Sequence, residues 1–240
     1  MAVGHRVEPD RWRAETDRLL ALIAARFGRI ETRRRAARFL VGLADLPRKN
    51  CWSIAEHAGD VDPHGMQYLL GRAGWDTDGV HDDLRDYVTT NLGDTDAVLV
   101  VDETGDLKKG TCTVGVQRQY TGTAGRIEDA QVAVYLTYAG ARGHAMIDRE
   151  LSLPKSWTGD PDRCAEAGVP ADIEFLTKPA LATGMIRRAL NAGVPARWIA
   201  GDEVYGADPA LRDELEIHQV GYVLAIGCDR RVPTVCRSET

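Results

Sequence analysis

Two aspartates, Asp102 and Asp202, each come directly after a short apolar run that has the character of a buried strand. The runs are Val-Leu-Val-Val before Asp102 and Trp-Ile-Ala-Gly before Asp202. If these strands are parallel neighbours, the residues after them emerge at one edge of the sheet and can share a cation. Carboxylate oxygens favour Mg²⁺ or Mn²⁺ over Zn²⁺. Such ions suit in-line displacement at a phosphodiester, whereas the alternative is that either aspartate only caps a turn.

The elements that must position these aspartates form an alternating strand and helix pattern. A continuous apolar run over 97–101, bounded by Asp96 and Asp102, predicts a strand buried on both faces. The segments predicted after it are strands over 113–120, 131–138 and 144–153, a helix over 177–191, a strand over 197–200, a helix from 208 to 221 and a strand over 222–226. Because a helix that links two strands favours a parallel crossover, this order predicts an α/β domain over 96–240.

The first 95 residues are predicted to form a separate helical domain. Apolar spacing indicates two amphipathic helices, and Arg34 and Arg38 lie one turn apart on the polar side of the second, with Arg35 adjacent. Two shorter helices are predicted between residues 53 and 71, with Ser53 and Glu56 at the spacing of a capping box. Such a pair resembles a helix-turn-helix, so this region is a candidate for DNA binding, although a solvated basic face is the alternative.

Charge is distributed unevenly along the chain. The net charge is −6, but the first 50 residues carry 12 Lys and Arg against 6 Asp and Glu, a balance of +6, so the other 190 carry −12. This asymmetry suits a DNA-facing amino-terminal section attached to an acidic, metal-binding body. The five cysteines are scattered singly and form no zinc motif. With no signal peptide and no long apolar run, we expect a cytoplasmic protein with no membrane partner.

Several motifs together resemble the catalytic core of insertion-sequence transposases of the DDE superfamily. They are Lys-Asn-Cys-Trp at 49–52, Val-Asp-Glu-Thr-Gly at 101–105, Lys-Lys-Gly at 108–110, Val-Gly-Val-Gln-Arg-Gln-Tyr at 114–120, Leu-Pro at 153–154 with Trp157, Thr-Lys-Pro at 177–179 and Gly-Asp-Glu-Val-Tyr-Gly at 201–206. The resemblance covers nearly the whole chain. It implies a ribonuclease-H-like mixed sheet with flanking helices, preceded by a small all-α domain.

The resemblance also implies an activity, which is metal-dependent DNA strand cleavage and strand transfer at transposon ends. Asp102 and Asp202 take the first two acidic positions and would bind Mg²⁺ or Mn²⁺. The partners implied are double-stranded DNA, at the transposon ends and the target, and a second copy of the chain in a homodimer on DNA. The residues expected near the site as phosphate contacts are Lys108, Lys109, Arg118 and Tyr205.

The sequence departs from the family pattern at the third carboxylate. The family places a glutamate on a helix well beyond the strand predicted at 222–226, whereas residues 228–240 show no helical stripe and contain Pro233. Glu239 is the only glutamate in that segment, and Glu214 and Glu216 precede the last strand. The hypothesis that follows is a truncated transposase that binds divalent metal weakly and cleaves DNA poorly or not at all.

Two other functions are compatible with parts of this pattern. A phosphatase of the haloacid-dehalogenase type also has an aspartate after its first buried strand, but Asp102-Glu103-Thr104 lacks the Asp-x-Asp spacing that such enzymes need. A non-catalytic DNA-binding regulator derived from a transposase would keep the basic amino-terminal helices and use the incomplete core as a scaffold. The salt dependence of DNA binding would distinguish a regulator from an inert fragment.

Overall fold

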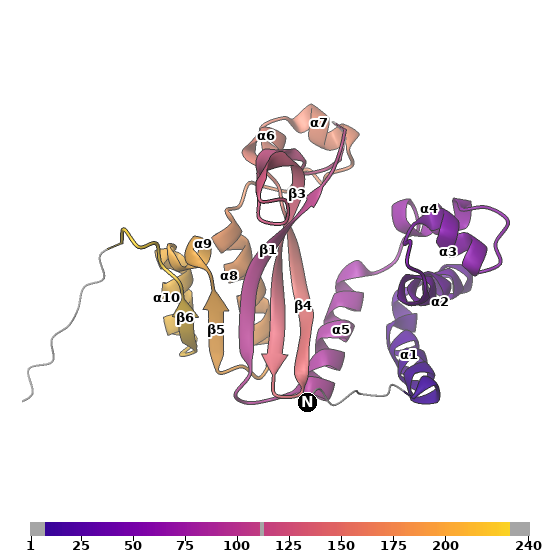
Figure 1. The fold of residues 1–240 in the computed structure, drawn as a ribbon, viewed down its shortest axis with the longest axis horizontal. Helices are drawn as coiled ribbons and strands as arrows, with labels where there is room; N and C mark the ends of the chain where they lie inside the picture. Colours follow the sequence, from indigo (N-terminus) through magenta and orange to yellow (C-terminus); the bar gives the residue numbers. More distant parts are fainter. Residues whose placement is uncertain (1–7, 111–112, 231–240) are drawn as a thin grey trace, which may run out of the picture. The chain divides into compact units, whose positions relative to one another are not determined.

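The computed structural model describes residues 8–110 and 113–230, so the tail that contains Glu239 lies outside the described residues (Figure 1). The chain divides into two compact units, Met1–Tyr87 and Val88–Thr240. The division falls inside helix α5 (Thr77–Leu92), upstream of the position between residues 95 and 96 that the sequence suggested. No helix in the described part of the chain is long and apolar enough to cross a membrane.

The first unit is built from helices. They are α1 (Pro9–Ile23), a short 3₁₀ turn (Ala24–Arg26), α2 (Ile30–Asp45), α3 (Cys51–His57), α4 (His64–Gly71) and the first part of α5. Helices α2, α3 and α4 enclose a small core of Ile54, Ala55 and Met66, against which partly buried apolar side chains of α2 pack. Gly42 permits close packing of α2 on α3, because a Cβ atom there would lie 2.9 Å from Ile54.

The cap of α3 differs from the one that the sequence predicted. The helix begins at Cys51 rather than Ser53, and the side chain of Asn50 accepts a hydrogen bond from the Ser53 backbone amide at 2.9 Å. Asn is among the strongest N-cap residues, so it takes the position that the Ser53 and Glu56 spacing suggested for serine. In the turn that follows, Gly59 has a φ of 77°, and α4 begins at His64, whose amide donates a hydrogen bond to the Asp62 side chain at 2.9 Å.

The second unit contains one six-stranded mixed sheet. Its strands are β1 (Val98–Leu107), β2 (Gln117–Thr121), β3 (Arg126–Gly140), β4 (Gly143–Ser152), β5 (Trp198–Gly201) and β6 (Gly221–Leu224). The strand order is β2-β3-β1-β5-β6, and β4 also pairs with β3. Strand β3 is antiparallel to β1, β2 and β4, whereas β5 is parallel to both β1 and β6. An antiparallel meander followed by two parallel strands is the ribonuclease-H-like arrangement predicted from the sequence.

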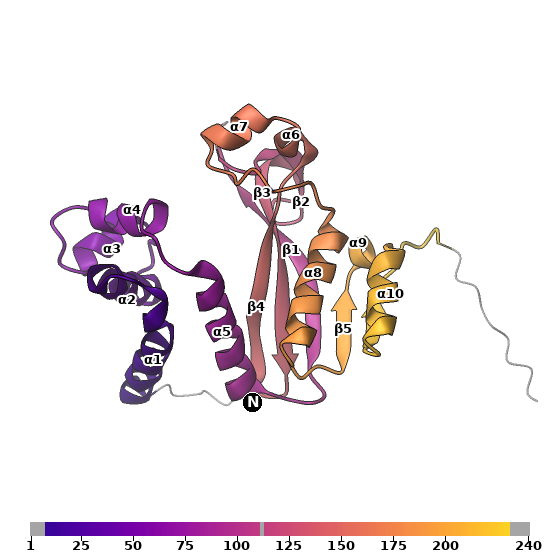
Figure 2. The same ribbon diagram turned by 180° about the vertical axis from the view of Figure 1, so that it is seen from behind.

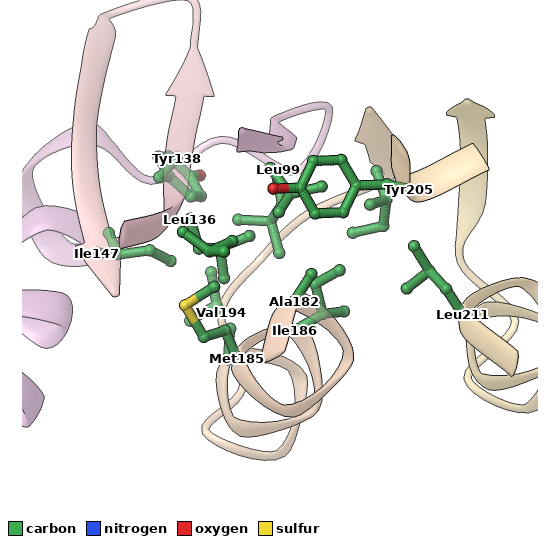
Figure 3. Close-up of a cluster of buried hydrophobic side chains, with 14 of the residues drawn as sticks. Leu99, Leu136, Tyr138, Ile147, Ala182, Met185, Ile186, Val194, Tyr205 and Leu211 are labelled. Carbon is green, nitrogen blue, oxygen red and sulfur yellow. The ribbon is translucent and has the colours of Figure 1, made fainter. Parts of the chain in front are cut away.

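Helices α8 (Lys178–Asn191), α9 (Glu203–Gly206) and α10 (Pro209–Ile217) lie on one face of this sheet. Figure 2 views the sheet with α8 in front, and Figure 1 views it from the opposite face. Side chains from β1, β3 and α8 fill the space between sheet and helices, including the fully buried Leu99, Leu136, Met185 and Ile186 (Figure 3). Alternate residues of β1 and β3 therefore face this core, and the residues between them face the other side.

Strand β1 is longer than the apolar run that predicted it. It continues past Asp102 to Leu107 because it stays paired with β3, as far as Leu107 opposite Ala130. Its partner on the other side, β5, ends at Gly201. The short helices α6 (Lys155–Thr158) and α7 (Pro161–Glu166) were not predicted, and they follow β4 near the distal end of the β2–β3 hairpin (Figure 1). The buried indole of Trp157 anchors them by donating to the Val116 carbonyl at 2.9 Å.

Candidate active site

Asp102 and Asp202 lie side by side on neighbouring parallel strands. The last paired residues of β1 and β5 are Val101 and Gly201, and each aspartate comes next in its chain. Leu99 and Ile199 also pair and face the core with α8, so both aspartates are on the opposite face of the sheet. Both side chains are exposed to solvent. The structure thus brings together the two residues that the strand pattern selected, at the edge where β5 ends.

Local backbone contacts hold each carboxylate by one oxygen. Asp102 Oδ1 accepts a hydrogen bond from the Glu103 amide at 2.8 Å. Asp202 is the N-cap of α9, and its Oδ1 accepts a hydrogen bond from the Val204 amide at 2.9 Å. The second oxygen of each aspartate has no hydrogen-bond partner among the residues that the structure describes. Each aspartate therefore has one carboxylate oxygen that could bind a metal ion, and the two aspartates lie on the same face of the sheet.

Glu103 is a site residue that the sequence reasoning missed. Its carboxylate accepts a hydrogen bond from Lys178 Nζ at 2.6 Å and from the Tyr205 hydroxyl at 2.7 Å. These contacts connect β1 to the first turn of α8 and to α9, immediately behind the two aspartates. The signal in the sequence was a charged residue at a core-facing position of β1, because alternation from Leu99 and Val101 places Glu103 on the helix-covered face. A carboxylate in that position requires partners.

Tyr205 is fully buried, in contrast to the solvent-facing phosphate contact that the resemblance suggested. Its ring packs in the core near Leu99 and Leu211 (Figure 3). Burial raises the pKa of the Tyr205 hydroxyl, as do its hydrogen bond to Glu103 and the nearby negative charges of Glu103, Asp102 and Asp202. The hydroxyl stays protonated and donates to Glu103, so Tyr205 supports the site from behind.

Lys108, Lys109 and Arg118 are exposed but lie far from the aspartates. Lys108 follows the end of β1, six residues beyond Asp102, which corresponds to about 20 Å along an extended strand. Arg118 pairs with Asp129 on β3, whereas Asp102 pairs with Tyr135 on that strand, so a similar length separates them. The structure therefore gathers these three cations at the distal end of the β1–β3 ribbon, and does not bring them to the acidic pair.

The three arginines of α2 have different surroundings in the first unit. Arg34 and Arg38 are exposed, and Arg38 forms an ion pair with Asp60 at 3.3 Å. Arg35 is half-buried, and its guanidinium lies over Gly65, where a Cβ atom would approach it to 2.5 Å. Arg35 thus covers the start of α4, and Arg34 and Arg38 present their charge to solvent.

The third carboxylate that the resemblance implies is not among the described residues after β6. Residues 225–230 form no helix. Glu214 and Glu216 lie on α10 and are engaged elsewhere, since Glu214 accepts two hydrogen bonds from Arg187 and Glu216 accepts one from Tyr222. Within residues 8–110 and 113–230, no group of three or more His, Cys, Asp or Glu side chains is arranged to hold a metal ion.

Two carboxylates are nevertheless a donor set that fits Mg²⁺. This ion keeps several waters and is commonly bound through one or two carboxylates together with phosphate oxygens of the substrate. Asp102 and Asp202 each offer one uncommitted oxygen on the same face. The donors are all oxygen, which disfavours Zn²⁺.

A separate cavity of about 710 Å³ lies between β4, α8 and residues 168–176, and its mostly apolar lining does not include the aspartates.

Comparisons with known proteins identify relatives over most of the chain. The sequence profile of a family described as DDE superfamily endonuclease matches residues 23–236. A probable transposase for insertion sequence element IS701 from Microchaete diplosiphon is 26% identical over 201 residues, which cover 81% of this chain and 49% of that protein. The chain therefore spans about half the length of this relative.

Among solved structures, the Drosophila P element transposase strand transfer complex is similar over 88% of this chain and 41% of the matched chain. The sequence identity is 13% and the TM-score is 0.31, a value too low to relate the two folds in detail.

Proposed function

This chain belongs to the DDE superfamily of endonucleases, and we propose that it acts as an insertion-sequence transposase that cuts and joins DNA at transposon ends. The family assignment covers both units, because the matched region begins in α1 and extends beyond β6. The transposition activity itself is a proposal, since the chain spans 49% of the IS701 relative.

The observation that carries the proposal is the adjacency of Asp102 and Asp202 at the edge where β5 ends. We assign both residues as ligands of a divalent cation, Mg²⁺ or Mn²⁺. The chemistry that such a cation supplies is Lewis-acid stabilisation of the charge that develops on a phosphodiester during in-line displacement. The protein's own contribution is to hold the two carboxylates on one face and to fix the backbone behind them through Glu103, Lys178 and Tyr205.

DNA contacts are proposed on both units. In the first unit, Arg34 and Arg38 are exposed on α2 and suit contacts to the phosphate backbone, which position a duplex without reading its sequence. In the second unit, Lys108, Lys109 and Arg118 would contact DNA away from the reacting phosphate. The family chemistry acts on two transposon ends, so the proposed assembly contains two copies of the chain on double-stranded DNA.

The direct test is metal-dependent cleavage of DNA that carries the terminal sequences of the element. We expect Mg²⁺ or Mn²⁺ to support weak strand cleavage at most, and Asp102→Asn and Asp202→Asn each to abolish it. Asp96→Asn is the matched control, because Asp96 precedes the same strand at its opposite end and pairs with Arg197 on the surface. Cleavage that survives in both site variants would contradict the assignment of the aspartates.

A non-catalytic DNA-binding regulator is the second candidate. It is favoured by the observation that no third metal-binding side chain joins Asp102 and Asp202 among the described residues. In this case the purified chain binds DNA with a steep dependence on salt, and Mg²⁺ produces no cleavage. The two functions therefore differ in one measurement made on the same protein and the same DNA.

A further inference from the structure

The acidic pair belongs to a row of polar side chains that crosses the sheet. Asp102 on β1 lies directly opposite Tyr135 on β3, and Tyr135 lies directly opposite Arg149 on β4. Directly opposed residues on antiparallel strands point to the same face, with Cβ atoms about 5 Å apart. The row therefore consists of Asp202, which follows the end of β5, then Asp102 on β1, Tyr135 on β3 and Arg149 on β4.

Burial agrees with this placement of Tyr135 and Arg149. The neighbours of Tyr135 along β3, Val134 and Leu136, are fully buried in the core beneath α8. Tyr135 is half-exposed and Arg149 is exposed, on the face turned away from α8. Asp148, next to Arg149, points the other way and pairs with Arg188 on α8 at 2.9 Å. Strand register and burial thus place Tyr135 and Arg149 on the same face of the sheet as Asp102.

The two sides of the acidic pair differ in chemistry. Towards β6, the residues on the same face are Val223, which is 67% exposed, and then Ala225. Towards β3 and β4 they are a phenol and a guanidinium, which are both hydrogen-bond donors. A DNA strand with one phosphate at the aspartates must continue to one side or the other. Among the strand residues that the structure describes on this face, Tyr135 and Arg149 are donors whereas Val223 is not, and arginine is suited to bind phosphate through paired N–H groups.

We infer that Tyr135 and Arg149 contact the DNA backbone beside the reacting phosphodiester, so that the cleaved strand crosses the sheet from β1 towards β4. This inference rests on the proposed function of the acidic pair. Arg149 lies two strand spacings, about 10 Å, from Asp102, a separation that suits a neighbouring phosphate better than the reacting one. The two residues are therefore substrate-binding residues, and the chemical step stays with the aspartates.

The experiment measures binding of a fluorescein-labelled DNA duplex to the full chain over a series of salt concentrations. Arg149→Ala should weaken binding about tenfold and lower the slope of log affinity against log salt by about one. Tyr135→Phe should weaken binding about threefold, as expected for one lost hydrogen bond, and leave the slope unchanged. Arg149→Lys should restore the slope, because it restores the charge.

Arg197→Ala is the control, since Arg197 is an exposed arginine just before the start of β5, whereas the acidic pair lies at the other end of that strand. It should leave the affinity and the slope as in the wild type. If the wild type binds DNA and Arg149→Ala has the same slope, the inference about the path of the strand is wrong and the proposed function stands. If the wild type binds no DNA at any salt concentration, the inference and the proposed function both fail.

Discussion

The Tyr205 hydroxyl donates a hydrogen bond to Glu103 over 2.7 Å, and this contact joins the residue that follows Asp102 to the helix that begins after Asp202. Lys178, at the start of α8, completes the arrangement with an ion pair to Glu103 at 2.6 Å. Three segments that are distant in the sequence therefore meet at one partly buried carboxylate. We expect this junction to help fix the separation of the two aspartates.

Removal of the Tyr205 hydroxyl should loosen this junction. Tyr205→Phe keeps the ring in the core but leaves Glu103 with Lys178 as its remaining side-chain partner. Because a hydrogen bond to a charged group contributes about 2 kcal/mol, we expect a loss of that size in the free energy of unfolding, measured in urea. Tyr222→Phe is the control, since it removes a comparable contact to Glu216 at the surface and should cost below about 0.5 kcal/mol. Equal losses in the free energy of unfolding would show that the hydrogen bond from Tyr205 to Glu103 stabilises the protein no more than a surface contact does.

Metal binding should change the order of stability among the aspartate variants. Without a divalent ion, the two neighbouring carboxylates repel each other, so Asp102→Asn should melt at a higher temperature than the wild type. With Mn²⁺ at about tenfold above its Kd, the wild type should gain about 1.4 kcal/mol and the variant should gain little. Thermal melts with and without Mn²⁺ make this comparison, with Asp96→Asn expected to respond as the wild type does. An unchanged order in the presence of Mn²⁺ would argue against a shared ion.

Two glycines of the second unit should respond to alanine in opposite directions. A Cβ atom at Gly206, on α9, would collide with the backbone carbonyl oxygen of Ala225, which cannot move without displacing the chain after β6. Gly206→Ala should therefore destabilise the protein by about 2 kcal/mol or more. Gly184 lies within α8, where the nearest atom to such a Cβ is the Arg188 guanidinium at 4.0 Å. Gly184→Ala should stabilise by about 0.5–1 kcal/mol, and melting temperatures of the two variants test both signs.

The pair formed by Arg26 and Asp83 should make the first unit sensitive to acid. Arg26 contacts the Asp83 carboxylate through two nitrogens at 2.8 and 2.7 Å, and this hydrogen bonding lowers the pKa of Asp83. A lowered pKa means that the stabilisation is present above the unfolded-state pKa of about 4 and is lost as pH falls through the folded-state value. Asp83→Asn should cost about 1 kcal/mol at neutral pH, allowing for the exposure of Arg26.

The difference between wild type and Asp83→Asn should shrink as the solution is acidified, and urea unfolding at a series of pH values measures it. Asp78→Asn, on the exposed side of the same helix, is the control and should stay within about 0.5 kcal/mol of the wild type. A difference that persists in acid would mean that Asp83 acts through packing rather than charge.

Local patterns predicted the placement of the acidic pair because each aspartate follows a strand with a clear apolar signature. The helix over 177–191 was equally legible, since Thr177 caps α8 and accepts a hydrogen bond from the Ala180 amide. Asp208 likewise caps α10. These features are encoded within a few residues, so one sequence is enough to recognise them.

The support behind the acidic pair was not predictable in the same way. Glu103 and Tyr205 are 102 positions apart, and no local pattern shows that one accepts a hydrogen bond from the other. The extension of β1 beyond Asp102 was also missed, because its polar residues gain their strand conformation from pairing with β3. Asn50 replaced Ser53 as the cap of α3 because two adequate capping residues lay close together, and spacing alone could not rank them.

Strand β1 extends beyond the point where β5 ends, and this difference in length sets a fixed distance along the sheet. Beyond the aspartates, β1 and β3 continue as a ribbon to Lys108 and Arg118, whereas β5 has already ended. The intervening length of about 20 Å equals the rise of about six base pairs of duplex DNA. DNA that crosses the sheet at the aspartates would meet these cations only through a part of the duplex that lies about 20 Å away along the strands. The lengths of β1 and β3 set this distance, and deleting two residues from each strand would shorten it by about 7 Å.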